Sequence, residues 1–137
     1  MSLTELYKQY HEEVQFLSIY IREAHPIDGW WLGRRLTKGI IRRIFPYPKA
    51  SMDHYDPKTI EERRAVAGEC ETALQYGIRT YVDEMDDRVN KAYAAWPTRL
   101  YLVGLDGKVL YGGGMGPYDF KPAKLKTAIE NYLTQIS

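Results

Sequence analysis

The sequence predicts a single α/β domain in which helices flank a mixed β-sheet. Helix start signals alternate with short apolar runs, as expected when helices cover a sheet. The first run is rich in β-branched and aromatic residues, which is typical of an interior parallel strand. Asp106-Gly107 separates the last two runs and favours an antiparallel hairpin. With 137 residues the chain can bury one core, so we expect one domain over residues 1–137.

Capping boxes mark two of the expected helix starts. In each, a hydroxyl at the N-cap and a carboxylate three residues later bond each other's backbone N–H groups, as for Ser2 with Glu5 and Thr59 with Glu62. Gly77 is a suitable residue to end the second helix. The expected helices cover residues 2–12, 59–76 and 88–96 and the C-terminal residues from Pro122.

The expected strands are short. Residues 14–21 form an apolar run too short for a helix of its own, which is typical of a buried strand. Residues 78–82 form a second such run, and the hairpin supplies the antiparallel edge of the sheet. The expected strands cover residues 14–21, 78–82, 99–105 and 108–112.

Residues 26–58 are expected to form an irregular insertion, because they contain four prolines and three glycines. Within them, residues 34–45 have an apolar helical face and basic residues elsewhere, which predicts a short amphipathic helix. This helix could dock on the core with a solvated basic face, or bind an anion or a lipid surface. We take the first interpretation, because one short basic helix is weak support for the second.

Composition excludes several classes of function. The net charge of +1 gives no reason to expect nucleic acid as a partner. No apolar run approaches the ~20 residues of a membrane span, and no signal segment is recognised, so a cytoplasmic protein is expected. Cys70, the only cysteine, falls on the apolar face of the helix over 59–76 and is expected to be a small core residue. His25, Asp28 and His54 match no defined ligand spacing, so no metal or cofactor is expected.

The stretch IYIREAHPIDGWW, residues 19–31, leads from a strand to two adjacent tryptophans. It resembles the signature of the iodothyronine deiodinases, in which E-A-H-x-x-D-G-W follows a strand. The stretches TIEERRAVA, VDEMDDRVNKAYAAWPTRLYLV and DGKVLYGGGMGP also follow in that family's order and spacing. The resemblance covers nearly the whole chain except the basic segment 34–45. It implies a thioredoxin-like fold of the peroxiredoxin-like form.

The resemblance implies roles for five residues. Glu23 and His25 would lie by a ring-bearing substrate and deliver a proton, since histidine titrates near neutral pH and a carboxylate can orient it. Trp30 would shape the pocket wall. Arg99 would face the site and stabilise a thiolate, a selenolate or a bound carboxylate. Pro97 would be the cis proline that precedes the first hairpin strand in thioredoxin-like proteins.

Each of these residues also has a purely structural interpretation. His25 could form a hydrogen bond at the end of the strand, and Glu23 could be a surface carboxylate. The two tryptophans could belong to the core, and Arg99 could pair with Asp83 or Asp86. We favour the site, because all of these residues occur together in one pattern.

In this family the reactive selenocysteine or cysteine ends a strand just before a helix, whose N-terminus stabilises its anion. The corresponding helix here is 2–12, so we expect that residue and its strand upstream of Met1, in a reading frame truncated at a UGA codon. The family order places this strand between 14–21 and 99–105. Without it both strands would have unpaired edges, so they could pair directly, or the chain could form a homodimer or strand-swapped oligomer.

Three functions remain open. The first is reductive dehalogenation of a phenolic or other aromatic substrate by a thiol or selenol oxidoreductase that uses a thiol reductant. The present chain would be inactive in this reaction without its nucleophile. The alternatives are a peroxiredoxin-like peroxide or thiol–disulfide reductase and a non-catalytic binding or assembly module of thioredoxin-like fold. We prefer the first, because it alone accounts for E-A-H-x-x-D-G-W.

Overall fold

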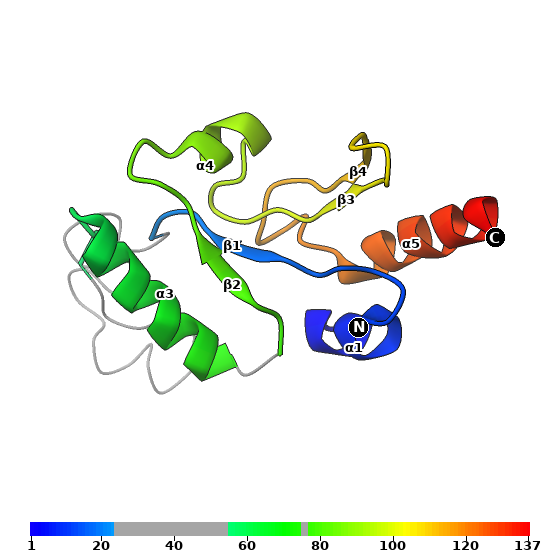
Figure 1. Ribbon diagram of the computed structural model, residues 1–137, viewed down its shortest axis with the longest axis horizontal. Coiled ribbons are helices and arrows are strands. Elements are labelled where there is room, and N and C mark those ends of the chain that lie inside the picture. Colours follow the sequence, from blue (N-terminus) through cyan, green and yellow to red (C-terminus); the bar gives the residue numbers. More distant parts are fainter. Residues whose placement is uncertain (24–54, 75–76) are drawn as a thin grey trace.

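The computed structural model describes residues 1–23, 55–74 and 77–137, and they form the mixed α/β fold that the sequence predicts (Figure 1). The helices are α1 (Leu3–Tyr10), α3 (Ile60–Leu74), α4 (Arg88–Tyr93) and α5 (Pro122–Ile136). The strands are β1 (Ser18–Tyr20), β2 (Thr80–Val82), β3 (Tyr101–Val103) and β4 (Val109–Gly112). Within these ranges no helix combines the length and the apolar character needed to cross a membrane.

The first helix begins where its capping box places it. Ser2 Oγ accepts a hydrogen bond from the backbone N–H of Glu5 at 3.2 Å, and Glu5 Oε2 accepts one from the backbone N–H of Ser2 at 2.6 Å. These bonds satisfy N–H groups that a helix start otherwise leaves free. α1 buries Leu6 and Tyr10 and ends at Tyr10, two residues before the predicted end.

In the described part of the chain, the strands form two separate two-stranded sheets. β1 runs parallel to β2, with Ile19 opposite Tyr81, which confirms the predicted parallel strand. β3 and β4 form the predicted antiparallel hairpin, with Leu102 opposite Tyr111 and an irregularity in register next to that pair. β1 and β3 do not pair, although Figure 1 shows β1 between β2 and the hairpin. The direct pairing that the sequence left open is therefore not formed here.

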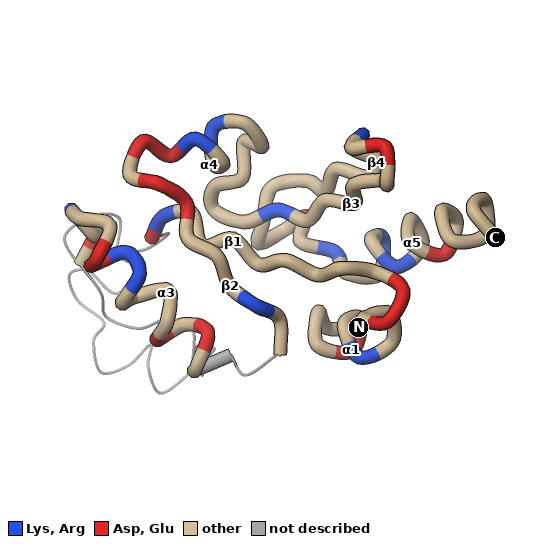
Figure 2. The backbone as a smooth tube through the Cα atoms, viewed as in Figure 1, with Lys and Arg blue, Asp and Glu red and all other residues tan. Residues whose placement is uncertain are grey.

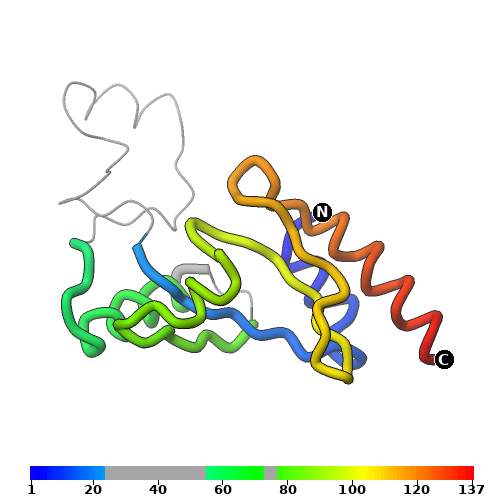
Figure 3. The backbone as a smooth tube through the Cα atoms, turned by 90° about the horizontal axis from the view of Figure 1, so that it is seen from above, coloured from blue at the N-terminus to red at the C-terminus, as the bar shows by residue number. Residues whose placement is uncertain are grey.

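Helices cover the two sheets separately. α1 and α5 pack together and α5 packs against the hairpin, around a shared buried core. This core contains Leu6, Tyr10, Leu102, Leu125 and Ile129. α3 packs along β2 and buries Val66 and Ala67. As a result α3 and α5 lie at opposite ends of the molecule, with β1 passing between them (Figures 1 and 3).

Several elements are shorter than predicted. α4 ends at Tyr93 and not at residue 96, because Ala94 adopts a left-handed conformation with φ 45°. β1 covers only part of the predicted strand, because its pairing with β2 extends over three residues. The predicted helix over 34–45, and most of the insertion that contains it, lie outside the described residues.

Two glycines give a matched test of the packing beside the hairpin. Gly116 donates its backbone N–H to the carbonyl of Thr98 at 2.9 Å, and a Cβ at Gly116 would clash with Thr98 Cγ2. Gly68 lies in α3, and no atom of another side chain lies within 4 Å of the place that a methyl group would take there. Gly116→Ala should lower the free energy of unfolding by about 1–3 kcal/mol through steric strain. Gly68→Ala should raise it by up to about 1 kcal/mol, because alanine favours a helix.

Urea denaturation of the two variants beside the parent chain measures both changes. A Gly116→Ala variant as stable as the parent would show that the loop at Gly116 does not pack against Thr98 as described.

Candidate functional site

The predicted site residues fall on two segments of the described structure. Glu23 follows β1, and Pro97 and Arg99 lie on the segment that leads into β3. Figures 1 and 3 show that β1 ends, and this segment begins, on the same side of the molecule. His25 and Trp30 lie outside the described residues.

A tyrosine that the sequence did not single out holds Glu23. The hydroxyl of Tyr20 donates a hydrogen bond to Glu23 Oε2 at 2.9 Å, and both side chains are half-buried. Burial raises the pKa of the Tyr20 hydroxyl, and the charge of Glu23 raises it further. Tyr20 therefore stays protonated and remains the donor to the carboxylate. The available signal was a phenol at the end of the predicted strand, three residues before the acid that follows it.

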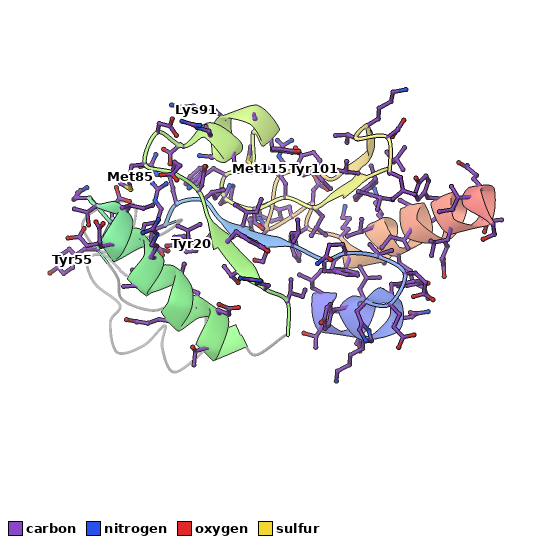
Figure 4. The ribbon with its side chains drawn as sticks, viewed as in Figure 1. Tyr20, Tyr55, Met85, Lys91, Tyr101 and Met115 are labelled. Atoms are coloured by element: carbon purple, nitrogen blue, oxygen red, sulfur yellow. The ribbon has the colours of Figure 1, made fainter. Side chains whose placement is uncertain are left out.

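Cys70 lies on α3, near this pair. Burial raises the pKa of its thiol, and the charges of Glu23 and then Glu69 raise it further. Figure 4 places Tyr20 beside α3, in agreement with that electrostatic contact. Cys70 is half-buried, so the expected core position is only partly reached. Because the thiolate is the reactive form, these surroundings make Cys70 a poor nucleophile near neutral pH.

Arg99 has the properties of an anion-binding side chain. It is half-buried, and its Nε atom is buried without a hydrogen-bond partner among the described residues. The two acids that could have paired with it are engaged elsewhere. Asp83 accepts bonds from backbone N–H groups at the start of α4, and Asp86 pairs with Arg88 at 2.9 Å. A guanidinium with a free N–H can bind a carboxylate or another anion.

The peptide bond between Trp96 and Pro97 is cis, as the sequence predicted. The neighbouring loop packs on this segment, because Gly116 donates its N–H to Thr98. Gly116 is itself followed by a second cis proline, Pro117, which was not predicted. Pro97 is half-buried and so lies close to the surface beside Arg99.

The acidic turn between β2 and α4, red in Figure 2, is bound to α3 by a buried arginine. Arg63 is 4% exposed, and its Nη1 donates to the carbonyls of Asp83 at 3.2 Å and Glu84 at 2.7 Å. Its Nη2 lies 2.9 Å from Asp87 Oδ1. Little in the sequence indicates this contact, because Arg63 looks like an ordinary charged residue of a helix. The cluster fixes the turn that leads toward Pro97 and Arg99.

The described side chains of the candidate site offer groups for proton and anion chemistry. Glu23 supplies an oriented carboxylate, and Arg99 supplies a cation with a free donor. Over the residues that the structure describes, no group of three or more histidine, cysteine, aspartate or glutamate side chains could hold a metal ion.

Comparisons with known proteins agree on one family. The family model described as iodothyronine deiodinase matches residues 2–133. The chain is 35% identical over 126 residues to thyroxine 5-deiodinase of Sparus aurata, covering 90% of this chain and 40% of the relative. It is 31% identical over 131 residues to thyroxine 5-deiodinase of Homo sapiens, covering 96% of this chain and 38% of the relative. The chain thus spans about two fifths of the length of these curated relatives.

The electrostatic contact between Glu23 and Cys70 can be tested through thiol reactivity. Glu23→Gln should lower the pKa of Cys70, so alkylation by iodoacetamide at pH 8 should be several-fold faster and its pH profile should move to lower pH. Glu61→Gln, an exposed change in the first turn of α3, serves as the matched control. Equal alkylation rates in the parent and Glu23→Gln would contradict the described position of Glu23.

Proposed function

Because the chain belongs to the iodothyronine deiodinase family, we propose that it forms the substrate-facing wall of an oxidoreductase that removes iodide from an iodinated aromatic ring. The observation that carries the proposal is the family match over residues 2–133, which includes both segments of the candidate site. The relatives named thyroxine 5-deiodinase support an iodinated phenolic compound of the thyroxine type as the substrate class.

The proposed reaction is a two-electron reduction. The ring carbon loses iodide and gains a proton and an electron pair, while two molecules of a thiol reductant are oxidised to a disulfide. One aryl iodide and two thiols therefore give the deiodinated ring, one disulfide, iodide and a proton. The enzyme must place the iodinated carbon between a chalcogen nucleophile and a proton donor.

We assign the proton donor to His25 and its orientation to Glu23. The bond from Tyr20 supports this assignment, because it orients the Glu23 carboxylate at the end of β1. We assign the binding of an anionic group to Arg99, supported by its free Nε atom among the described residues. Trp30 and Pro97 would form the wall against the ring.

Cys70 is not the nucleophile in this proposal. It lies on α3 with a raised pKa, which disfavours the thiolate. The family resemblance instead expects a selenocysteine or cysteine before the helix that corresponds to α1, and that expectation stays a prediction. We therefore expect residues 1–137 alone to release no iodide from thyroxine.

Iodide release tests the proposal directly. The complete reading frame of the gene, with any in-frame UGA read as selenocysteine or replaced by a cysteine codon, should release iodide from thyroxine in the presence of dithiothreitol. His25→Ala should lower the rate by roughly 10²–10⁴-fold, because general acid catalysis contributes about that much. His11→Ala, an exposed change at the end of α1, should leave the rate unchanged.

Hydrogen peroxide reduction by the same protein distinguishes deiodination from the alternative, a peroxiredoxin-like peroxide reductase. Peroxide reduction without iodide release, or full deiodination by His25→Ala, would contradict the proposed roles.

We further propose that the described elements belong to a thioredoxin-like arrangement with an open position between β1 and β3. Ser18 and Tyr20 bond to the β2 side, and Leu100 and Gly104 bond to the β4 side. Since alternate residues of a strand point their backbone groups to opposite edges, Ile19 and Val103 point theirs away from these partners. Two unpaired edges so close together favour association with another strand.

The expected association is most simply a homodimer. Multi-angle light scattering should give about twice the 15.9 kDa mass of the chain. Ile19→Lys, which places a charge on the open edge of β1, should shift the mass toward the monomer. Leu105→Lys, at a side chain 90% exposed beyond β3, should not. A clean monomer for the parent chain would argue against association through these edges.

A further inference from the structure

The segment that carries Pro97 and Arg99 is held at both ends by α4. At its start, the backbone N–H of Trp96 donates a hydrogen bond to Asn90 Oδ1 at 3.0 Å. Just after its end, the hydroxyl of Tyr101 donates to the backbone carbonyl of α4's last residue, Tyr93. The rings of these two tyrosines also meet edge to face, with centroids 5.0 Å apart. The position of the segment is therefore set by α4 and not by the strands alone.

Asn90, which accepts the bond from Trp96, is itself held in place by the buried Asp83. Asp83, 2% exposed, accepts hydrogen bonds from the backbone N–H groups of Val89 at 3.0 Å and Asn90 at 2.9 Å. Its backbone carbonyl accepts a bond from Arg63, so the start of α4 is bound to α3. The backbone of Asn90 is therefore held in place by a buried carboxylate, and this fixes where its side chain begins.

The identity of Asn90 points to a role beyond forming the helix. Asparagine is a poor helix former because its amide competes for backbone hydrogen bonds, yet it lies inside a helix of only six residues. Its amide oxygen is used on Trp96, and its backbone carbonyl accepts a bond from Ala95 at 3.0 Å. The amide oxygen and the backbone carbonyl of Asn90 therefore both accept bonds from the two residues that precede Pro97.

We propose that Asn90 is a positioning residue: its amide oxygen fixes Trp96 and thereby sets where Pro97 and Arg99 face the substrate. The inference rests on the proposed function for the role of Arg99. The acceptor on Asn90 is what matters, so aspartate, which keeps an oxygen at the same place, should replace it and alanine should not.

The first test observes Trp96 directly and needs no substrate. In chain labelled with 5-fluorotryptophan, the three tryptophans give three ¹⁹F signals, and Trp96→Phe assigns one of them. Asn90→Ala should move the Trp96 signal by more than its linewidth, and Asn90→Asp should return it toward the parent position. Lys91→Ala is the matched control. It removes the hydrogen bond from Lys91 Nζ to the carbonyl of Asp86, which lies away from Tyr101, and should leave the signal in place (Figure 4).

The second test measures binding of diiodotyrosine, an iodinated phenol that carries a carboxylate. By calorimetry Asn90→Ala should weaken binding by about tenfold, the effect expected from losing one well-placed hydrogen bond. In an Arg99→Ala background the same change should have a much smaller effect, because most of the contribution of Asn90 to binding passes through Arg99.

An unmoved Trp96 signal in Asn90→Ala, or an equal further loss of binding in the Arg99→Ala background, would overturn the inference. Absence of binding by the parent chain would instead count against the proposed function for these residues. In that case the Trp96 signal still decides whether Asn90 holds the segment.

Discussion

The structure around the candidate site depends on one buried guanidinium. A buried cation is costly unless it is paired. Arg63 donates to two backbone carbonyls and forms an ion pair with Asp87, while its Nε atom has no hydrogen-bond partner among the described residues. These partners all come from the turn after β2. The turn is therefore pulled onto α3 and cannot open without leaving the charge unpaired. The same contact helps to hold Asp87 in its left-handed conformation, with φ 56°.

From this turn the constraint passes along the chain by hydrogen bonds. Asp83 uses its two carboxylate oxygens on the first turn of α4, so that a helix of six residues has a fixed start. α4 in turn bonds the segment before β3, and Gly116 bonds that segment from the other side. The bonds made by Asp83 and by Asn90 join residues that are near in sequence. The bond from Gly116 to Thr98 is long-range, and so is the contact of Arg63 that joins α3 to the turn after β2. The site segment inherits its position from these long-range contacts.

The second general constraint comes from the strands. β1 and β3 each pair along one edge only. The backbone groups on the other edge of each strand must find partners in another strand or in water. A short parallel pair and a short hairpin are each marginal alone, so helices provide most of their support. This division explains why the core under the hairpin, formed with α1 and α5, is separate from the contact of α3 with β2.

The sequence by itself determined the features that depend on neighbouring residues. Both capping boxes, the parallel strand, the Asp-Gly hairpin and the start of α5 at Pro122 follow local rules. The E-A-H and W-P patterns indicated the family, and they made Glu23, Pro97 and Arg99 candidates for the site. Only the tertiary structure decided how these parts are held. The place of Cys70 near Glu23 and the buried partners of Arg63 depend on which faces meet after folding. The bonds from Tyr20 to Glu23 and from Trp96 to Asn90 are local, but no sequence rule singled them out. The partners of Arg63 lie about twenty residues away along the chain, and no local pattern encodes a contact that distant.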